Sequence, residues 1–376
     1  MNGDITLAPS TAVTIGLGTG AGAFNLSNAE LGDITTTGSL VVGDATSGNI
    51  TADEVDVVGQ DLSLVTGGTI NDDDDTGAAI ATTGTLTLDA GSTIGDSGGA
   101  AGLDIDVGAL TVTGSGGDVT LRDVGSTSST TYSVTTGGAH DVSITQSNNP
   151  LAVSGISTTG TVSLTSLNGV ITTSGTITSG GSLITLNASD GVSVGGSVTG
   201  GQINIDADTD TDGTGDFSTT AAVALNSGGA SIEVVADDVT LFAGSSLNAG
   251  AGTVTLRPAT TSAINVGSPT GDFDLTDAEL DQITAGSLVI GDTSTRSGAI
   301  TIDGVTYGGD LTLRTNSTID DSDDTGVAVD AANLTLTSNG AIGSANAQGL
   351  DIDVGALTVT GSGGDVTVTD AGSTDT

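Results

Sequence analysis

The residues best suited to chemistry form an acidic run at positions 206–216, which reads DADTDTDGTGD. Four aspartates follow the D-x-D-x-D-G-x-x-D spacing of calcium loops: Asp208, Asp210, Asp212 and Asp216. Alternate carboxylates in such a loop converge on one hard cation, and the glycine permits the tight turn around it. A helix-flanked calcium hand needs an acid at the twelfth loop position, where this chain has Thr219, so an open loop site fits better. We therefore predict calcium at these four aspartates; the alternative is an acidic insertion that bulges from the fold.

Two further acidic runs span Asp72–Asp75 and Asp320–Asp324, the second interrupted by Ser322. Adjacent carboxylates repel one another unless cations or solvent screen them. Both runs are therefore interpreted as solvated corners, with loose binding of divalent cations as the alternative.

Catalytic constellations are harder to assemble. The chain has one histidine, His140, and neither Cys nor Lys, so the usual pairs of nucleophile and base cannot form. Solenoid enzymes that process polysaccharides combine acids with basic residues and aromatic clefts, whereas this chain has four Arg and 2% aromatic residues. We therefore expect that this chain is not an enzyme. The alternative is a solenoid that binds or processes polysaccharides.

The charge is strongly acidic, with 46 Asp and Glu against four Arg and a formal net charge of −42. Nothing in such a chain neutralises phosphates, so neither nucleic acid nor an anionic membrane is an expected partner. No stretch is long enough to insert into a membrane, and the first residues, MNGDITLAPS, lack the pattern of a signal peptide. If the protein is secreted, its signal is expected outside this sequence. The absence of Cys fits a bacterial surface protein that does without disulfides.

The elements that must position these acids are short runs in which apolar residues alternate with Thr, Ser or Asp. Examples are GTLTLDA (84–90), GTVSLTS (160–166) and NLTLTS (333–338). This period of two indicates strands with one buried face, and the gaps between them are rich in Gly, Asn, Ser and Asp. The pattern predicts an all-β parallel β-solenoid with coils of roughly 20 residues and Val, Ile and Leu inside. Ser27–Glu30 and Thr276–Glu279 fit the capping box, which indicates either one helical turn or a corner loop.

A longer period overlies the coils. Residues 102–127 and 349–374 differ at only three positions, Leu121/Val368, Arg122/Thr369 and Val124/Ala371. The repeated unit is about 249 residues long, and a long unit repeated one and a half times is expected to be part of a longer array. We predict a first super-repeat over 1–251 and a truncated second one over 252–376, continuous with the first.

Threonines flank the inward apolar residues on many strands, as in Thr85-Leu-Thr87 and Thr111-Val-Thr113. Stacked coils would place them in flat outward ladders, which resemble the ice-binding faces of some antifreeze solenoids. The alternative is that Thr is simply a favourable outward residue on a strand.

The phrases LTDAELDQITAGSLVIGD (275–292) and GTLTLDAGSTIGD (84–96) resemble the large repetitive exoproteins of Gram-negative bacteria, the filamentous-haemagglutinin-like adhesins. The resemblance implies a right-handed parallel β-helix, export through an outer-membrane partner or an autotransporter-type pore, and roles in adhesion and biofilm. It leads us to expect an extracellular structural segment of a giant surface protein, either an adhesin shaft or a self-associating filament, stiffened by calcium. The expected partners are other copies of the chain, end to end or side by side, or host and cell-surface glycans. An ice-binding adhesin segment is a minor alternative.

Overall fold

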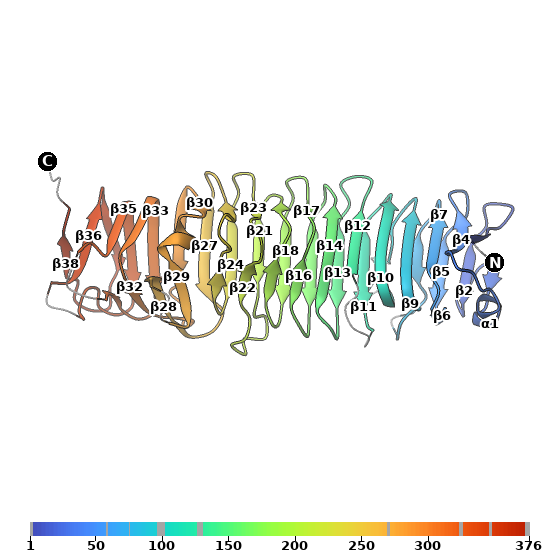
Figure 1. The fold of residues 1–376 in the computed structure, drawn as a ribbon, viewed down its shortest axis with the longest axis horizontal. Coiled ribbons are helices and arrows are strands. Elements are labelled where there is room, and N and C mark those ends of the chain that lie inside the picture. Colours follow the sequence, from blue (N-terminus) through green and yellow to red (C-terminus); the bar gives the residue numbers. More distant parts are fainter. Residues whose placement is uncertain are drawn as a thin grey trace. The chain divides into compact units, whose positions relative to one another are not determined.

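The structure is a computed structural model that describes residues 3–57, 59–74, 76–95, 102–125, 131–268, 271–322, 326–345 and 348–372. The chain is an all-β parallel β-solenoid of about 13 turns, with about 23 residues per turn and almost no helix (Figure 1). The predicted fold class is confirmed, although the turns are longer than the roughly 20 residues expected. The right-handed sense implied by the resemblance stays a prediction.

Two compact units divide the chain, Met1–Thr185 and Leu186–Thr376. The strands of the first unit are β1 Ile5–Leu7, β2 Ile15–Gly18, β3 Phe24–Leu26, β4 Leu40–Asp44, β5 Ile50–Asp53, β6 Val55–Asp56, β7 Leu62–Thr66, β8 Ile70–Asp72, β9 Ile80–Ala90, β10 Leu103–Ser115, β11 Val119–Asp123, β12 Thr131–Thr135, β13 Val142–Gln146, β14 Leu151–Ser157, β15 Val162–Ser166, β16 Ile171–Thr173 and β17 Ile177–Thr178. The next strand, β18 Ile184–Ala188, contains the division. The predicted super-repeat boundary at 251/252 comes from sequence similarity and not from contacts between residues, so this division does not test it and it stays a prediction.

The strands of the second unit are β19 Val192–Val194, β20 Val198–Thr199, β21 Ile203–Asp206, β22 Phe217–Thr219, β23 Ala224–Asn226, β24 Ile232–Ala236, β25 Val239–Thr240, β26 Ser246–Asn248, β27 Thr253–Pro258, β28 Ser262–Gly267, β29 Phe273–Thr276, β30 Ile283–Thr284, β31 Ser287–Gly291, β32 Ser297–Ile302, β33 Val305–Thr315, β34 Ile319–Asp321, β35 Val329–Ser338, β36 Leu350–Val354, β37 Leu357–Gly361 and β38 Val368–Asp370.

Inside the coils, apolar side chains stack in columns. On β7, β9, β10 and β12 one column runs Leu64, Leu88, Val112, Val134, each residue paired in parallel register with the next. All four are at most 2% exposed. Because side chains alternate across a strand, the burial pattern of β7 and β13 alternates strictly, and the outward positions of β13 are held by Ser143 and Thr145. The ladder expected from the sequence is confirmed.

The coils differ in length because their corners carry insertions. Ile144 stacks on Leu164, a spacing of 20 residues, whereas Leu256 stacks on Ile290, a spacing of 34. The longer coil contains β28, β29 and a short helix in addition to the main strands. Such insertions raise the average number of residues per turn above the roughly 20 residues of the shortest coils.

Both capping boxes form a single helical turn, α1 over Asn28–Gly32 and α2 over Asp277–Leu280. In α2 the Thr276 backbone N–H and hydroxyl donate to Glu279 Oε2 at 2.9 and 2.7 Å. Leu280, on the inner side of the turn, is fully buried. The choice between a helical turn and a corner loop is therefore settled in favour of the turn.

Candidate metal-binding corners

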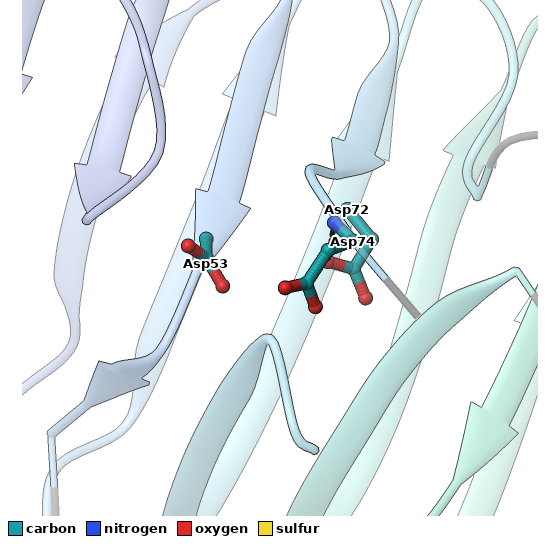
Figure 2. A group of neighbouring side chains, drawn as sticks. All are labelled: Asp53, Asp72 and Asp74. Atoms are coloured by element: carbon teal, nitrogen blue, oxygen red, sulfur yellow. Dashed lines mark hydrogen bonds between the residues drawn. The ribbon is translucent and has the colours of Figure 1, made fainter. Parts of the chain in front are cut away.

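In the first unit, three carboxylates meet where neighbouring strands end. Asp53 is the last residue of β5, Asp72 is the last of β8, and Asp74 follows it (Figure 2). Carboxylate oxygens from all three lie within 4.8 Å of one another. The parallel register of β5 and β8 pairs Ala52 with Asp72, so two successive coils contribute to the group.

Two backbone N–H groups and one hydroxyl donate hydrogen bonds to this group. Asp72 Oδ1 accepts a hydrogen bond from the Asp74 N–H at 3.2 Å, and its Oδ2 accepts one from the Asp104 N–H at 3.3 Å. The Thr19 hydroxyl donates to Asp53 Oδ2. Burial raises the pKa of Asp72 despite these donors, and the nearby Asp74 carboxylate adds to the increase. A divalent cation would relieve both effects. Calcium takes 6–8 oxygens, so carbonyls or water would complete the shell around this triad.

A second triad, Asp190, Asp210 and Asp212, lies in the second unit, and all three residues are exposed. It contains two of the four predicted calcium ligands. The Thr209 N–H donates to the Ala188 carbonyl at 2.9 Å, which brings the acidic loop beside the corner that carries Asp190. As in the first triad, the carboxylates come from corners that belong to different coils.

Asp208, the first of the predicted ligands, shapes the loop. Its side chain is 1% exposed, and its two oxygens accept hydrogen bonds from the N–H groups of Asp212 and Gly213, each at 3.2 Å. Burial, followed by contact with the Asp210 carboxyl, raises the pKa of Asp208 to about 6. Asp208 therefore stabilises the turn that presents Asp210 and Asp212.

Asp237 lies beside Asp208 on the neighbouring coil. The register of β21 and β24 pairs Asp206 with Val235, which places residues 208 and 237 at the same position of successive corners. Asp237 accepts hydrogen bonds from the Gly215 N–H and the Thr260 hydroxyl, both at 2.7 Å. The charge of Asp237 further raises the pKa of Asp208. It also raises the pKa of Asp216, an exposed residue, although desolvation by nearby protein atoms is the larger cause there.

The sequence interpretation missed Asp190 and Asp237. Asp237 would have been found by aligning IDADTD with VVADDV (residues 205–210 and 234–239), because both segments end a strand of the same column. Asp190 is the single acid of the segment NASDGV (187–192), so the local sequence gives no comparable signal.

The other acidic runs lie only partly within the described residues, which leave out Asp75, Asp323 and Asp324. Asp320 Oδ1 accepts hydrogen bonds from the N–H groups of Ser344 and Ala345, at 2.6 and 2.9 Å. Asp321 Oδ2 accepts one from the Asp351 N–H at 3.2 Å. These carboxylates therefore tie one coil to the next. The remaining candidate, His140, is a partly exposed side chain whose Nδ1 lies 3.9 Å from Asp118 Oδ1.

Comparison with known proteins found no matching family model, no matching curated protein and no matching solved structure. The likeness to filamentous-haemagglutinin-like exoproteins is therefore a likeness of repeat style, and what is shown is the β-solenoid fold. In the part of the chain that the structure describes, neither short helix is long and apolar enough to cross a membrane.

Proposed function

We propose that this chain is a structural β-solenoid, an extracellular segment of a bacterial surface protein that serves as an adhesin shaft or a self-associating filament. The observation that carries the proposal is the coil stacking, in which parallel ladders such as Leu64, Leu88, Val112 and Val134 continue from coil to coil. A solenoid of this kind grows by adding coils, and each coil contacts mainly its neighbours. Length and surface are what such an architecture provides.

Calcium has a structural role in this proposal. The net charge of −42 makes the surface repel itself, and both triads draw carboxylates from different coils. A cation held by Asp53 and Asp72 would therefore bridge the ends of β5 and β8, which are hydrogen-bonded neighbours. Binding would stabilise the stacked state and leave the unfolded chain unaffected.

The test compares thermal unfolding in calcium and in chelator. Open extracellular sites bind calcium with dissociation constants of roughly 0.1–1 mM, so millimolar calcium should add about 1–2 kcal/mol to the stability of the wild type. The variant Asp53→Asn/Asp72→Asn should lose much of this gain, whereas the control Asp118→Asn/Asp141→Asn, exposed acids outside both triads, should keep it. Equal calcium responses in the two double variants would reject the bridging role of this triad.

The mechanical role is tested separately by negative-stain electron microscopy of the native protein. Elongated particles or filaments support a shaft or fibre, and filaments that fragment on chelation support calcium stiffening. Turnover of an acidic polysaccharide by the purified chain would contradict the structural assignment and favour a processing solenoid.

A further inference from the structure

One stretch of the first unit is nearly free of charge. Residues 131–185 contain a single acid, Asp141, and no Lys or Arg, in a chain with 46 acidic residues. The stretch carries β12 to β17. A partner that covers this surface removes water from hydroxyl and methyl groups. Removing water from a carboxylate costs far more free energy, and this surface contains almost none. This is the part of the described surface that an uncharged partner can approach at the least cost.

A groove of about 310 Å³ lies within this stretch, across β12, β14 and the β16–β17 segment. Its volume is at the lower end of the range for ligand sites. The lining includes five hydroxyl side chains and one glycine: Ser133, Thr135, Ser157, Thr176, Thr178 and Gly155.

A β-bulge creates the groove. Tyr132 pairs with Val153, but the next residue, Ser133, pairs with Gly155, so Ser154 is an extra residue in β14. The bulge puts a glycine in the outward column beside Ser133. A Cβ at position 155 would meet nothing nearer than the Thr176 carbonyl oxygen at 3.6 Å, an ordinary contact. The glycine is thus not demanded by close packing, and its effect is to leave that column open. Bulges recur beside binding sites, where they re-aim side chains.

The hydroxyls of the groove are available for a ligand. Within the described residues, none of the five makes a side-chain hydrogen bond to the protein. The hydroxyls at the adjacent corner differ, because Thr136 donates to Thr158 Oγ1 at 2.9 Å and Thr158 donates to the His140 carbonyl. Each free hydroxyl offers one donor and two acceptor positions. The groove therefore combines hydrogen-bonding groups of both kinds with threonine methyls and carries no charge.

We propose that this groove binds a neutral glycan, with a short stretch of the sugar chain lying across β12, β14 and β17. Sugar hydroxyls would exchange hydrogen bonds with the five free hydroxyls, and the C–H faces of the rings would pack on the methyls of Thr135, Thr176 and Thr178. An acidic polysaccharide is disfavoured because the chain has a net charge of −42 and this stretch has no Lys or Arg. The site is independent of the structural role proposed above.

The test is native affinity electrophoresis of the full chain in gels that contain dextran, laminarin, galactomannan or, as the acidic probe, polygalacturonate. At least one neutral polysaccharide should retard the chain, and polygalacturonate should not. The variant Thr176→Val/Thr178→Val should weaken that binding about tenfold or more, the equivalent of losing one or two hydrogen bonds. Valine is well accepted on strands, so the fold should persist, as circular dichroism can verify.

The matched control is Ser163→Ala/Thr165→Val, which removes two outward hydroxyls of β15 that do not line the groove. This control variant should be retarded by the neutral polysaccharide as strongly as the wild type. The variant Gly155→Leu, whose side chain fills the open column, should not be retarded. The proposal is overturned if no neutral polysaccharide retards the wild type, if polygalacturonate retards it as strongly, or if the groove and control variants lose binding equally. If the wild type shows thermal hysteresis and no glycan binding, and Thr176→Val/Thr178→Val loses the hysteresis, the glycan proposal is overturned in favour of an ice-binding surface. None of these failures bears on the calcium or microscopy tests of the structural role.

Discussion

Two coils of the molecule have almost the same sequence and very different surroundings. Leu110 in β10 is 1% exposed, whereas its counterpart Leu357 in β37 is 38% exposed. The pair Val119 and Val366 differs in the same way, at 0% and 45%. Strand β10 pairs with β9 on one side and with β11 and β12 on the other, whereas the described residues give β37 one partner, β35. Burial in this fold is thus decided by the neighbouring coil and not by the sequence of the coil itself.

The strongest test of this comparison is to truncate the paired leucines. Leu110→Ala removes a fully buried side chain and should cost about 2–5 kcal/mol, whereas Leu357→Ala should cost less than about 1 kcal/mol. Thermal and denaturant unfolding of the two variants measure the difference. Equal costs would show that the two coils are equally covered in solution and would break the comparison.

Two glycines at corresponding positions, Gly95 and Gly343, allow a second comparison of the two coils. Both have positive φ, 75° and 64°, and a Cβ on either would lie 2.0 Å from a carbonyl oxygen of the following coil, that of Thr120 or Thr367. Gly95→Ala should cost about 1–3 kcal/mol, through left-handed strain and displacement of β11.

Gly343→Ala should cost less, because β38 has one described neighbour, β36, and can shift, whereas β11 is held by both β10 and β13. Gly308→Ala is the control, since a Cβ there meets nothing within 4 Å. The same unfolding measurements apply, and a larger loss at Gly343 than at Gly95 would contradict the argument.

The neighbouring coil also contributes to the ionisation of a buried acid, Asp208, through Asp237. The pKa of Asp208 is raised to about 6, against an ordinary value of 3.8. The folded state therefore binds more protons than the unfolded state between about pH 4 and 6, and the free energy of unfolding contributed by this group rises as the pH falls through that range. The contribution is on the order of 1–3 kcal/mol; it is fully present below about pH 4 and is lost as the pH rises through about 6.

The variant Asp208→Asn retains an acceptor for the loop N–H groups but cannot titrate. Its melting temperature should therefore gain less than that of the wild type between pH 7 and pH 5. Asp89→Asn, at an exposed position on β9 in another coil, should follow the wild type. A wild type that loses stability over this interval, with Asp208→Asn losing it equally, would refute the buried-carboxyl account.

Local patterns were readable from the sequence because they depend on residues close together in the chain. The alternation in GTLTLDA predicts a strand, which is confirmed. The Ser27–Glu30 capping box limits that corner to a helical turn or a loop, and the structure shows the turn. Features set by stacking were not readable. The meeting of Asp208 with Asp237 depends on the register between coils, and the groove at Gly155 depends on a one-residue bulge. The exposure of Leu357 depends on which coil lies beside it.

The smallest expected effect concerns one of the three positions at which the twin segments differ. Arg122 Nη1 lies 3.4 Å from Asp104 Oδ2, and the Asp104 side chain is fully buried. The counterpart Thr369 instead donates a hydrogen bond to the Gln348 carbonyl at 2.5 Å. Arg122→Thr should cost about 1 kcal/mol, less than a fully buried pair, because the arginine is 36% exposed and partly screened. The cost should shrink in high salt, and Arg314→Thr, at an exposed position on β33, should be nearly neutral. A loss that salt does not alter would assign the role of Arg122 to the packing of its aliphatic stem over the coil and not to its charge.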